Sequence, residues 1–266
     1  HSDALNRVEK HHLAQPPSGP PRAFRVGVPA FDLFPFDVWA KLNAAFWRKP
    51  DLQQLCYGDS QGDARLRGLI AAYLRSSRGL HCTAEQIVIT SGAQQAISLC
   101  AQLLVSPGDG VAIENPGYSG LRGILSASGT ETVNVDIDAD GLPPDAIPKR
   151  IDAVFTTASH QCPTNATMPL ERRLALLEAA GREGFVIVED DYEFEMSFLK
   201  PVSPALKSLD TEGRVVYVGS FSKSVFPGMR LGYLVGPASF IRAARALRLT
   251  TVRHPPGHIQ RTLAYF

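Results

Sequence analysis

Short apolar strands and amphipathic helices alternate along this chain from about residue 85 to about residue 235. Runs rich in β-branched residues predict strands at 87–90, 111–114, 132–137, 151–157, 185–188 and 214–218. Between these runs apolar residues recur at helical spacing, as Ile97, Cys100 and Leu104 do. The alternation predicts an α/β fold with a mostly parallel central sheet that helices cover on both faces.

Helices are also predicted before the alternation begins. Asp37 is placed to cap the first of them. The apolar face of this helix consists of Val38, Trp39, Leu42 and Phe46. A second helix follows a turn at 57–62. Its apolar face consists of Leu66, Leu69, Ile70, Tyr73 and Leu74.

A helix predicted from Phe240 to Thr250 carries Arg242, Arg245 and Arg248 at a spacing that keeps them along one side. That side is either an ordinary solvated face or a patch that contacts DNA phosphates. The net charge of +1 gives the 266-residue chain no overall basic field. Contact with nucleic acid therefore depends on a local patch or on another segment.

The residues best suited to chemistry lie in the stretch Gly219–Tyr233, which reads GSFSKSVFPGMRLGY. Lys223 comes just after the last predicted strand, at the sheet edge where open α/β folds bind ligands. Ser220, Ser222 and Arg230 offer hydroxyls and a permanent cation that can hold a phosphate beside the lysine amine. This combination suits a phosphorylated aldehyde cofactor.

Two other interpretations fit this stretch. A lysine after a strand is often only a solvated surface cation. Ser220 to Lys223 also fits the Ser-x-x-Lys pattern of penicillin-binding enzymes. Those enzymes need Ser-Asp-Asn and Lys-Thr-Gly as well, and the sequence contains neither. The acyl-enzyme interpretation is thereby excluded, and the cofactor interpretation depends on the rest of the chain.

Two further strand ends support a site at this sheet edge. Ser91 to Gln94 should form the first turn of a helix, whose exposed N–H groups can bind an anion. After the strand at 185–188, a period of two places Asp190 and Tyr192 on one face and Glu189 and Asp191 on the other. Adjacent carboxylates that diverge argue against a metal site, and no metal is expected. The acidic run is then either an ordinary loop or the source of a partner for a ring cation.

Six motifs resemble, in order, the aminotransferase-like domain of MocR-type transcription regulators of the GntR superfamily. They are FDLFPFDVW, SGAQQA, ENPGYSG, SHQCPT, VEDDYEFE and GSFSKSVFPGMRLGYLV, and the resemblance covers the chain from Phe31 onward. It implies the type I fold of pyridoxal 5′-phosphate (PLP) enzymes. It also implies that Lys223 forms an internal aldimine with PLP, that Asp190 binds the pyridine nitrogen, and that Tyr192 approaches the ring hydroxyl.

The same resemblance assigns the remaining contacts of the cofactor. Tyr118 would stack on the ring. The phosphate would be held by Ser220, Arg230 and the backbone of Gly92, Ala93 and Gln94. Tyr57 would reach the phosphate of a partner subunit, which implies a homodimer with a shared PLP site.

The sequence also departs from the aminotransferase pattern. Cys162 stands where aminotransferases have the Asn of Asn-Pro-Thr-Gly, and Asn165 replaces the Gly. We expect residues 1–30 to be a Pro-rich interdomain linker and 31–266 to be a C-terminally incomplete aminotransferase-like domain. An upstream winged helix DNA-binding domain is implied, and the small domain with its carboxylate-binding arginine would lie beyond Phe266.

Two functions fit this resemblance. In the first, the chain senses an amine or amino-acid-like effector through aldimine exchange at Lys223 and regulates transcription. In the second, it is an aminotransferase that acts on an amino acid. Cys56, Cys82, Cys100 and Cys162 form no Cys-x-x-Cys pair, which predicts free thiols in a reducing compartment. Without a signal peptide or a bilayer-length apolar run, we expect a cytoplasmic protein with no membrane partner.

Overall fold

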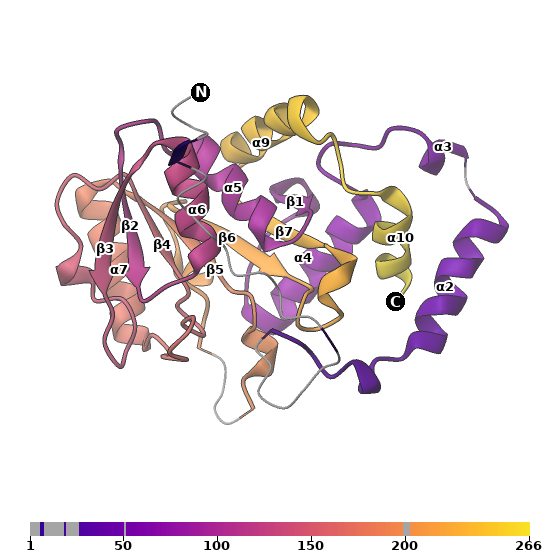
Figure 1. Ribbon diagram of the computed structural model, residues 1–266, viewed down its shortest axis with the longest axis horizontal. Helices are drawn as coiled ribbons and strands as arrows, with labels where there is room; N and C mark the ends of the chain where they lie inside the picture. Colours follow the sequence, from indigo (N-terminus) through magenta and orange to yellow (C-terminus); the bar gives the residue numbers. More distant parts are fainter. Residues whose placement is uncertain (1–5, 8–18, 20–26, 51, 199–202) are drawn as a thin grey trace.

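A seven-stranded sheet crosses the centre of the protein in the order β1-β7-β6-β5-β4-β2-β3 (Figure 1). The computed structural model describes residues 6–7, 19, 27–50, 52–198 and 203–266. The strands are β1 (Ile87–Thr90), β2 (Gly110–Asn115), β3 (Glu131–Asp136), β4 (Ala153–Thr156), β5 (Val186–Asp190), β6 (Val215–Ser220) and β7 (Gly232–Val235). Paired strands are parallel, except that β7 runs antiparallel to β1 and β6. The predicted mostly parallel sheet is confirmed.

Strand β7 is an addition to the strands predicted from the sequence. It lies between β1 and β6, so the loops that follow those two strands are separated by the width of one strand. A Cβ atom on Gly232 would come within 2.8 Å of the Gly92 carbonyl carbon and 3.0 Å of the Ala93 nitrogen. Glycine is therefore needed for this close approach, and it also weakens the strand signal in the sequence.

Helices cover both faces of the sheet, as the alternation predicts. One face packs against α5 (Ala93–Leu104), α6 (Ser119–Ser128) and α9 (Ala238–Thr251). The other packs against α4 (Ala64–Arg78), α7 (Leu170–Glu183), α8 (Leu206–Leu209) and α10 (Gly257–Tyr265). Farther out, α2 (Phe36–Arg48) and α3 (Leu52–Leu55) lie beyond α10 (Figure 1). Within the described part of the chain, no helix is both long and apolar enough to cross a lipid bilayer.

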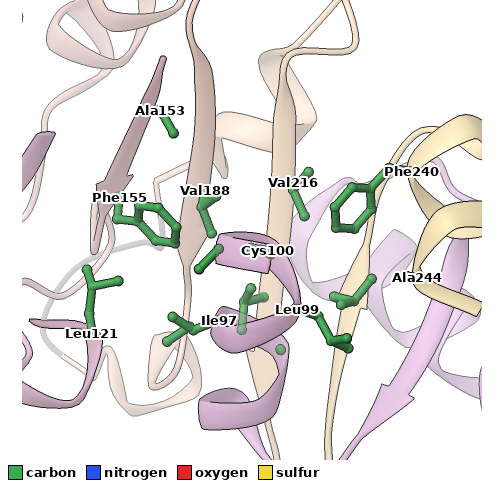
Figure 2. Packing of buried hydrophobic residues seen from close by; sticks show 14 of the residues in the cluster. Ile97, Leu99, Cys100, Leu121, Ala153, Phe155, Val188, Val216, Phe240 and Ala244 are labelled. Atoms are coloured by element: carbon green, nitrogen blue, oxygen red, sulfur yellow. The ribbon is translucent and has the colours of Figure 1, made fainter. Parts of the chain in front are cut away.

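Helix α5 packs its apolar side onto the middle of the sheet (Figure 2). Ile97 and Cys100 of α5 are buried together with Val188 of β5 and Val216 of β6. Burying one such aliphatic side chain contributes about 1.5–3 kcal/mol. The apolar layer therefore holds the start of α5 in place at the carboxyl end of the parallel strands.

Two local predictions for the N-terminal helices are wrong. Helix α2 begins at Phe36, so Asp37 lies inside the first turn and makes no capping hydrogen bond. In α4, Ile70 and Leu74 are buried as predicted, but Leu69 is 45% exposed. Leu69 lies at the margin of the apolar stripe, one residue before Ile70, and the margin of a stripe faces solvent more than its centre does.

The three arginines of α9 do not share one side of the helix. Arg248 is fully buried and donates a hydrogen bond to the Ile89 carbonyl, whereas Arg245 pairs with Asp59 at 3.2 Å. Because a helix turns 100° per residue, two steps of three residues rotate the side chain by about 120° in total. Both predicted alternatives, a solvated face and a DNA-contacting patch, are therefore wrong for Arg248.

The predicted linker at residues 1–30 lies mostly outside the described residues. Of that range, the structure describes 6–7, 19 and 27–30. The four cysteines are all free thiols, and Cys82 and Cys100 are buried in the apolar layers.

Candidate cofactor site

The loop between β1 and α5 forms a cradle for an anion at the sheet edge. Helix α5 begins at Ala93 after Gly92, so the helix starts two residues later than the predicted turn at Ser91. Gly92 has a φ of 80°, and a Cβ there would lie 2.9 Å from Nη2 of Arg230. The same Nη2 donates to the Ser91 carbonyl at 3.1 Å. A permanent cation thus lies against the positive end of a helix, which suits a phosphate group.

Two serines and Lys223 follow β6 at the same edge. Ser220 Oγ donates to Ser222 Oγ at 3.0 Å and accepts from the Ser222 backbone N–H at 3.1 Å. Lys223 is half-buried, and within the described ranges no residue makes a hydrogen bond or ion pair with its amine. A Cβ on Gly27 would lie 3.3 Å from Lys223 Nζ. The amine thus has no partner among the described residues, and it lies close to the backbone of Gly27.

Asp190 ends β5 and lines a cavity with Ile97, Phe155 and Tyr118. The residue as a whole is partly exposed, but its Oδ1 is buried and has no hydrogen-bond partner in the described part of the protein. Burial, followed by the carboxylates of Asp191 and Glu114, raises the pKa of Asp190 from 3.8 to about 7. A buried acceptor without a donor is costly, and a cationic ring N–H would satisfy it. Asp190 therefore fits a pyridine-nitrogen partner.

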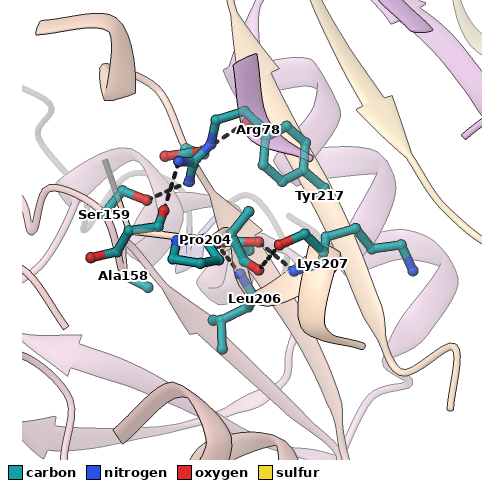
Figure 3. Close-up of polar contacts among 12 residues, drawn as sticks. Arg78, Ala158, Ser159, Pro204, Leu206, Lys207 and Tyr217 are labelled. Carbon is teal, nitrogen blue, oxygen red and sulfur yellow. Dashed lines mark hydrogen bonds and ion pairs between the residues drawn. The ribbon is translucent and has the colours of Figure 1, made fainter. Parts of the chain in front are cut away.

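The neighbouring carboxylates bind partners on the other face of the sheet, as the strand period predicts, and Figure 3 labels Arg78, Tyr217 and Leu206 among these partners. Asp191 Oδ2 pairs with Arg78 Nη2 at 2.7 Å and accepts from the Tyr217 hydroxyl at 2.8 Å. Glu189 accepts from the backbone N–H groups at the start of α8, at 2.8 and 2.9 Å. Arg173 lies 3.7 Å from Glu189. Asp191 and Glu189 are thus paired within the protein, whereas Asp190 faces the cavity. Within the described residues, no cluster of His, Cys, Asp or Glu has the arrangement of a metal site.

Tyr118 stands at the mouth of the cavity, before α6. Its hydroxyl donates to Gln94 Oε1 at 2.5 Å, and Gln94 Nε2 donates to the Gly120 carbonyl at 3.3 Å. Burial and the Asp190 carboxylate raise the pKa of the Tyr118 hydroxyl. These bonds link the starts of α5 and α6, so the Tyr118 ring is held near Asp190. Stacking on a cofactor ring remains a prediction.

Tyr192 and Cys162 lie on neighbouring loops. The Tyr192 ring contacts His160 edge-on, with the two centroids 6.3 Å apart. Burial raises the pKa of the Cys162 thiol, and burial also raises that of the Tyr192 hydroxyl. His160 in turn is hydrogen-bonded to Asn165 at 2.9 Å. The role of Tyr192 at a ring hydroxyl remains a prediction.

Tyr57 does not lie in this site. It is 80% exposed, and the guanidinium of Arg253 stacks over its ring at 4.6 Å. The contact with a partner's cofactor remains a prediction.

Sequence reasoning missed three residues that belong to the site. Glu114 lines the cavity beside Asp190, and Gln161 holds Glu114 by a hydrogen bond of 3.0 Å. Both lie in the motifs ENPGYSG and SHQCPT, where only neighbouring residues were interpreted. An acidic residue at the end of an apolar strand was the available signal for Glu114. The contact of Gly27 with Lys223 left no signal, because 196 positions separate the two residues.

Residues 24–265 match the family model of aminotransferase class I and II. The chain belongs to this family. Among curated relatives of this family member, the HTH-type transcriptional regulator TauR of Rhodobacter capsulatus is 56% identical over 211 residues, which are 79% of this chain and 43% of TauR. The probable rhizopine catabolism regulatory protein MocR of Rhizobium meliloti is 36% identical over 92% of this chain and 50% of MocR. The chain spans about half the length of these relatives.

Solved structures of aminotransferases share the fold. LysN, the α-aminoadipate aminotransferase of Thermus thermophilus, is 28% identical with a TM-score of 0.84, over 99% of this chain and 66% of LysN. That structure is complexed with N-(5′-phosphopyridoxyl)-L-leucine. The kynurenine aminotransferase of Pyrococcus horikoshii is 29% identical with a TM-score of 0.82, over 90% of this chain and 61% of the enzyme. The family and these structures confirm the predicted type I fold and imply PLP as the cofactor.

Proposed function

We propose that this chain is the PLP-binding, effector-sensing domain of a transcription regulator that responds to an amine or amino-acid-like ligand. The observation that carries the regulatory part is the 56% identity to a transcriptional regulator across 79% of the chain. The shared sheet edge of Lys223, Arg230 and the unpartnered Asp190 Oδ1 supports PLP as the cofactor. A transcription regulator must reach the DNA, and the proposal therefore includes a cytoplasmic location.

Each contact of the proposed cofactor has a residue suited to it. Bound PLP supplies a reactive carbonyl carbon and an electron-withdrawing ring. Lys223 provides the amine for that carbon, and Asp190 accepts the ring N–H. Tyr118 would cover one face of the ring, and Tyr192 would approach the ring hydroxyl. The phosphate is held by Ser220, Ser222, Arg230 and the backbone of Gly92, Ala93 and Gln94.

Regulation then needs only two states of the same site. An effector amine would compete with Lys223 for the cofactor carbon, and the lysine amine, which lies near Gly27, would then be unbound. A ligand that binds the two states with different affinity shifts their populations. The change would pass to a DNA-binding domain upstream of the linker at residues 1–30. Tyr57 of a second copy completes the site in a homodimer.

Covalent mapping tests the first part of this proposal. The protein is incubated with PLP, reduced with borohydride and digested, and the peptides are analysed by mass spectrometry. We expect the adduct on Lys223. Lys207 serves as the control, because its amine is paired with Asp210 at 2.9 Å. An adduct on Lys207, or none, would overturn the assignment.

A second candidate function is amino transfer. Aromatic-amino-acid aminotransferase 1 of Thermococcus litoralis is 33% identical over 81% of this chain. A sensor should shift its PLP absorption when its amine is added, yet yield little keto acid over many cofactor equivalents. Rapid multiple turnover of an amino acid and a keto acid, without operator binding by the protein, would favour the aminotransferase.

A further inference from the structure

A second buried carboxylate lines the cavity that contains Asp190. Glu114, near the end of β2, is 5% exposed. Its Oε1 accepts from Thr156 Oγ1 at 2.6 Å and from the Thr157 backbone N–H at 3.0 Å. Its Oε2 accepts from Thr157 Oγ1 at 2.6 Å and from Gln161 Nε2 at 3.0 Å. Both oxygens act as acceptors, which is the pattern that an ionised carboxylate provides.

In the described part of the chain no arginine or lysine makes an ion pair with the Glu114 carboxylate, and Arg122 donates only to the Glu114 backbone carbonyl, at 3.2 Å. In the described part of the chain, the ion pairs of arginine and lysine go to other carboxylates. Burying an anion among neutral donors is costly unless something else in the cavity compensates for it. On the other face of β5 that compensation comes from Arg78 and Arg173. Among the described residues no arginine forms such a pair with the Glu114 carboxylate, although Glu114 and Asp190 line one cavity.

Gln161 helps to fix the orientation of the Glu114 carboxylate. Gln161 is 1% exposed, and its Nε2 also donates to the Pro116 carbonyl at 2.9 Å and to the Cys162 carbonyl at 2.8 Å. Its Oε1 accepts from the Thr164 backbone N–H at 3.0 Å. One amide therefore joins the loop before Tyr118 to the loop that contains Cys162, and it fixes the carboxylate between them.

We propose that Glu114, oriented by Gln161, is a second anion of the cofactor site that makes the cavity selective for a ring carrying a positive charge on its nitrogen. This inference rests on the proposed binding of PLP. Asp190 contacts the ring nitrogen, and Glu114 acts on it through space as a positioning residue. Two carboxylates on one cavity favour a cation more than one does, because a nearby opposite charge stabilises the charged form of a titrating group.

The test compares PLP with its 1-deaza analogue, in which carbon replaces the ring nitrogen and no ring cation can form. Dissociation constants of both ligands are measured by fluorescence titration of the purified protein. The wild-type protein should prefer PLP. Glu114→Gln removes one charge close to the ring, and at an effective dielectric constant near 20 this should reduce the preference about tenfold. The ratio of the two constants cancels any general loss of affinity.

Thr156→Val is the matched control, because it removes one hydrogen bond to Glu114 but leaves the charge in place. Its preference for PLP should stay within about twofold of the wild-type value. If Glu114→Gln does not fold, Glu114→Met removes the same charge without placing an amide opposite the threonines. An unchanged preference in the Glu114 variants, or an equal loss in Thr156→Val, would overturn the role of Glu114 while leaving PLP binding intact. A wild-type protein that binds neither ligand would overturn both proposals.

Discussion

The two faces of the β5 end use similar carboxylates in opposite ways. On the paired face, Asp191 and Glu189 are buried against Arg78 and Arg173. On the cavity face, Asp190 has a buried oxygen to which none of the described residues donates. A charge that is neutralised within the chain contributes to the fold, whereas one that is not creates a demand for a ligand. The difference indicates where a cofactor belongs, although all three residues are consecutive in the sequence.

The largest effect should come from breaking the paired face. Arg78→Met leaves the Asp191 carboxylate buried without its cation, and removal of one partner of a buried pair costs about 3–5 kcal/mol. Urea unfolding of the variant measures this loss. Arg182→Met is the control, because its pair with Glu183 is largely exposed and should contribute less than about 1 kcal/mol. Similar losses for both variants would contradict the distinction.

The cavity face should respond in cofactor affinity instead. Asp190→Asn replaces a charged acceptor for the ring nitrogen with a neutral one, and we expect PLP binding to weaken about 100-fold. Asp191→Asn should destabilise the protein but change the PLP affinity of its folded form far less. Equilibrium titration of both variants checks this. Equal losses of affinity would show that the two faces are not functionally distinct.

Acidity offers a third comparison, in the protein without PLP. The pKa of Asp190 is about 7 in the folded protein, and in the unfolded chain it takes the ordinary value of 3.8. Between pH 3.8 and pH 7 the folded protein therefore binds more protons than the unfolded chain does. The contribution of Asp190 to stability is therefore greatest below pH 4 and falls as the pH rises to 7. Because the residue is partly exposed, we expect a loss of about 2 kcal/mol, less than the full shift implies. Unfolding curves of wild type and Asp190→Asn from pH 4 to 8 should differ in slope by this amount, and parallel curves would contradict it.

The smallest effects should come from the two tyrosines that donate hydrogen bonds on either face. Tyr118→Phe loses the bond to Gln94 and should weaken PLP binding by about 1 kcal/mol with little change in stability. Tyr217→Phe loses the bond to Asp191 and should lower stability by about 1 kcal/mol without changing PLP affinity. Measurements of PLP affinity and of unfolding on both variants test whether one variant loses affinity and the other loses stability. The opposite pattern would reverse the assignment of the faces.

Most of the sheet was predictable because apolar strands with regular spacing leave a strong local signal. Strand β7 was not, since Gly232 interrupts its apolar run to let the strand approach α5. Lys223, Asp190, Ser220 and Arg230 could be named from motifs and strand ends. Their hydrogen bonds could not, because a bond such as that from Arg230 to Ser91 joins residues far apart in the chain.

By itself, the sequence determined the α/β alternation, the position of Lys223 at a strand end, and the separation of Asp190 from its acidic neighbours. These features depend on residue type and on a period of two or 3.6 residues, which are local properties. Only the tertiary structure decided that Arg78 and Arg173 neutralise one face, that Gln161 binds Glu114, and that Arg248 is buried. Burial and charge balance depend on which distant segments pack together, and no local pattern records that packing.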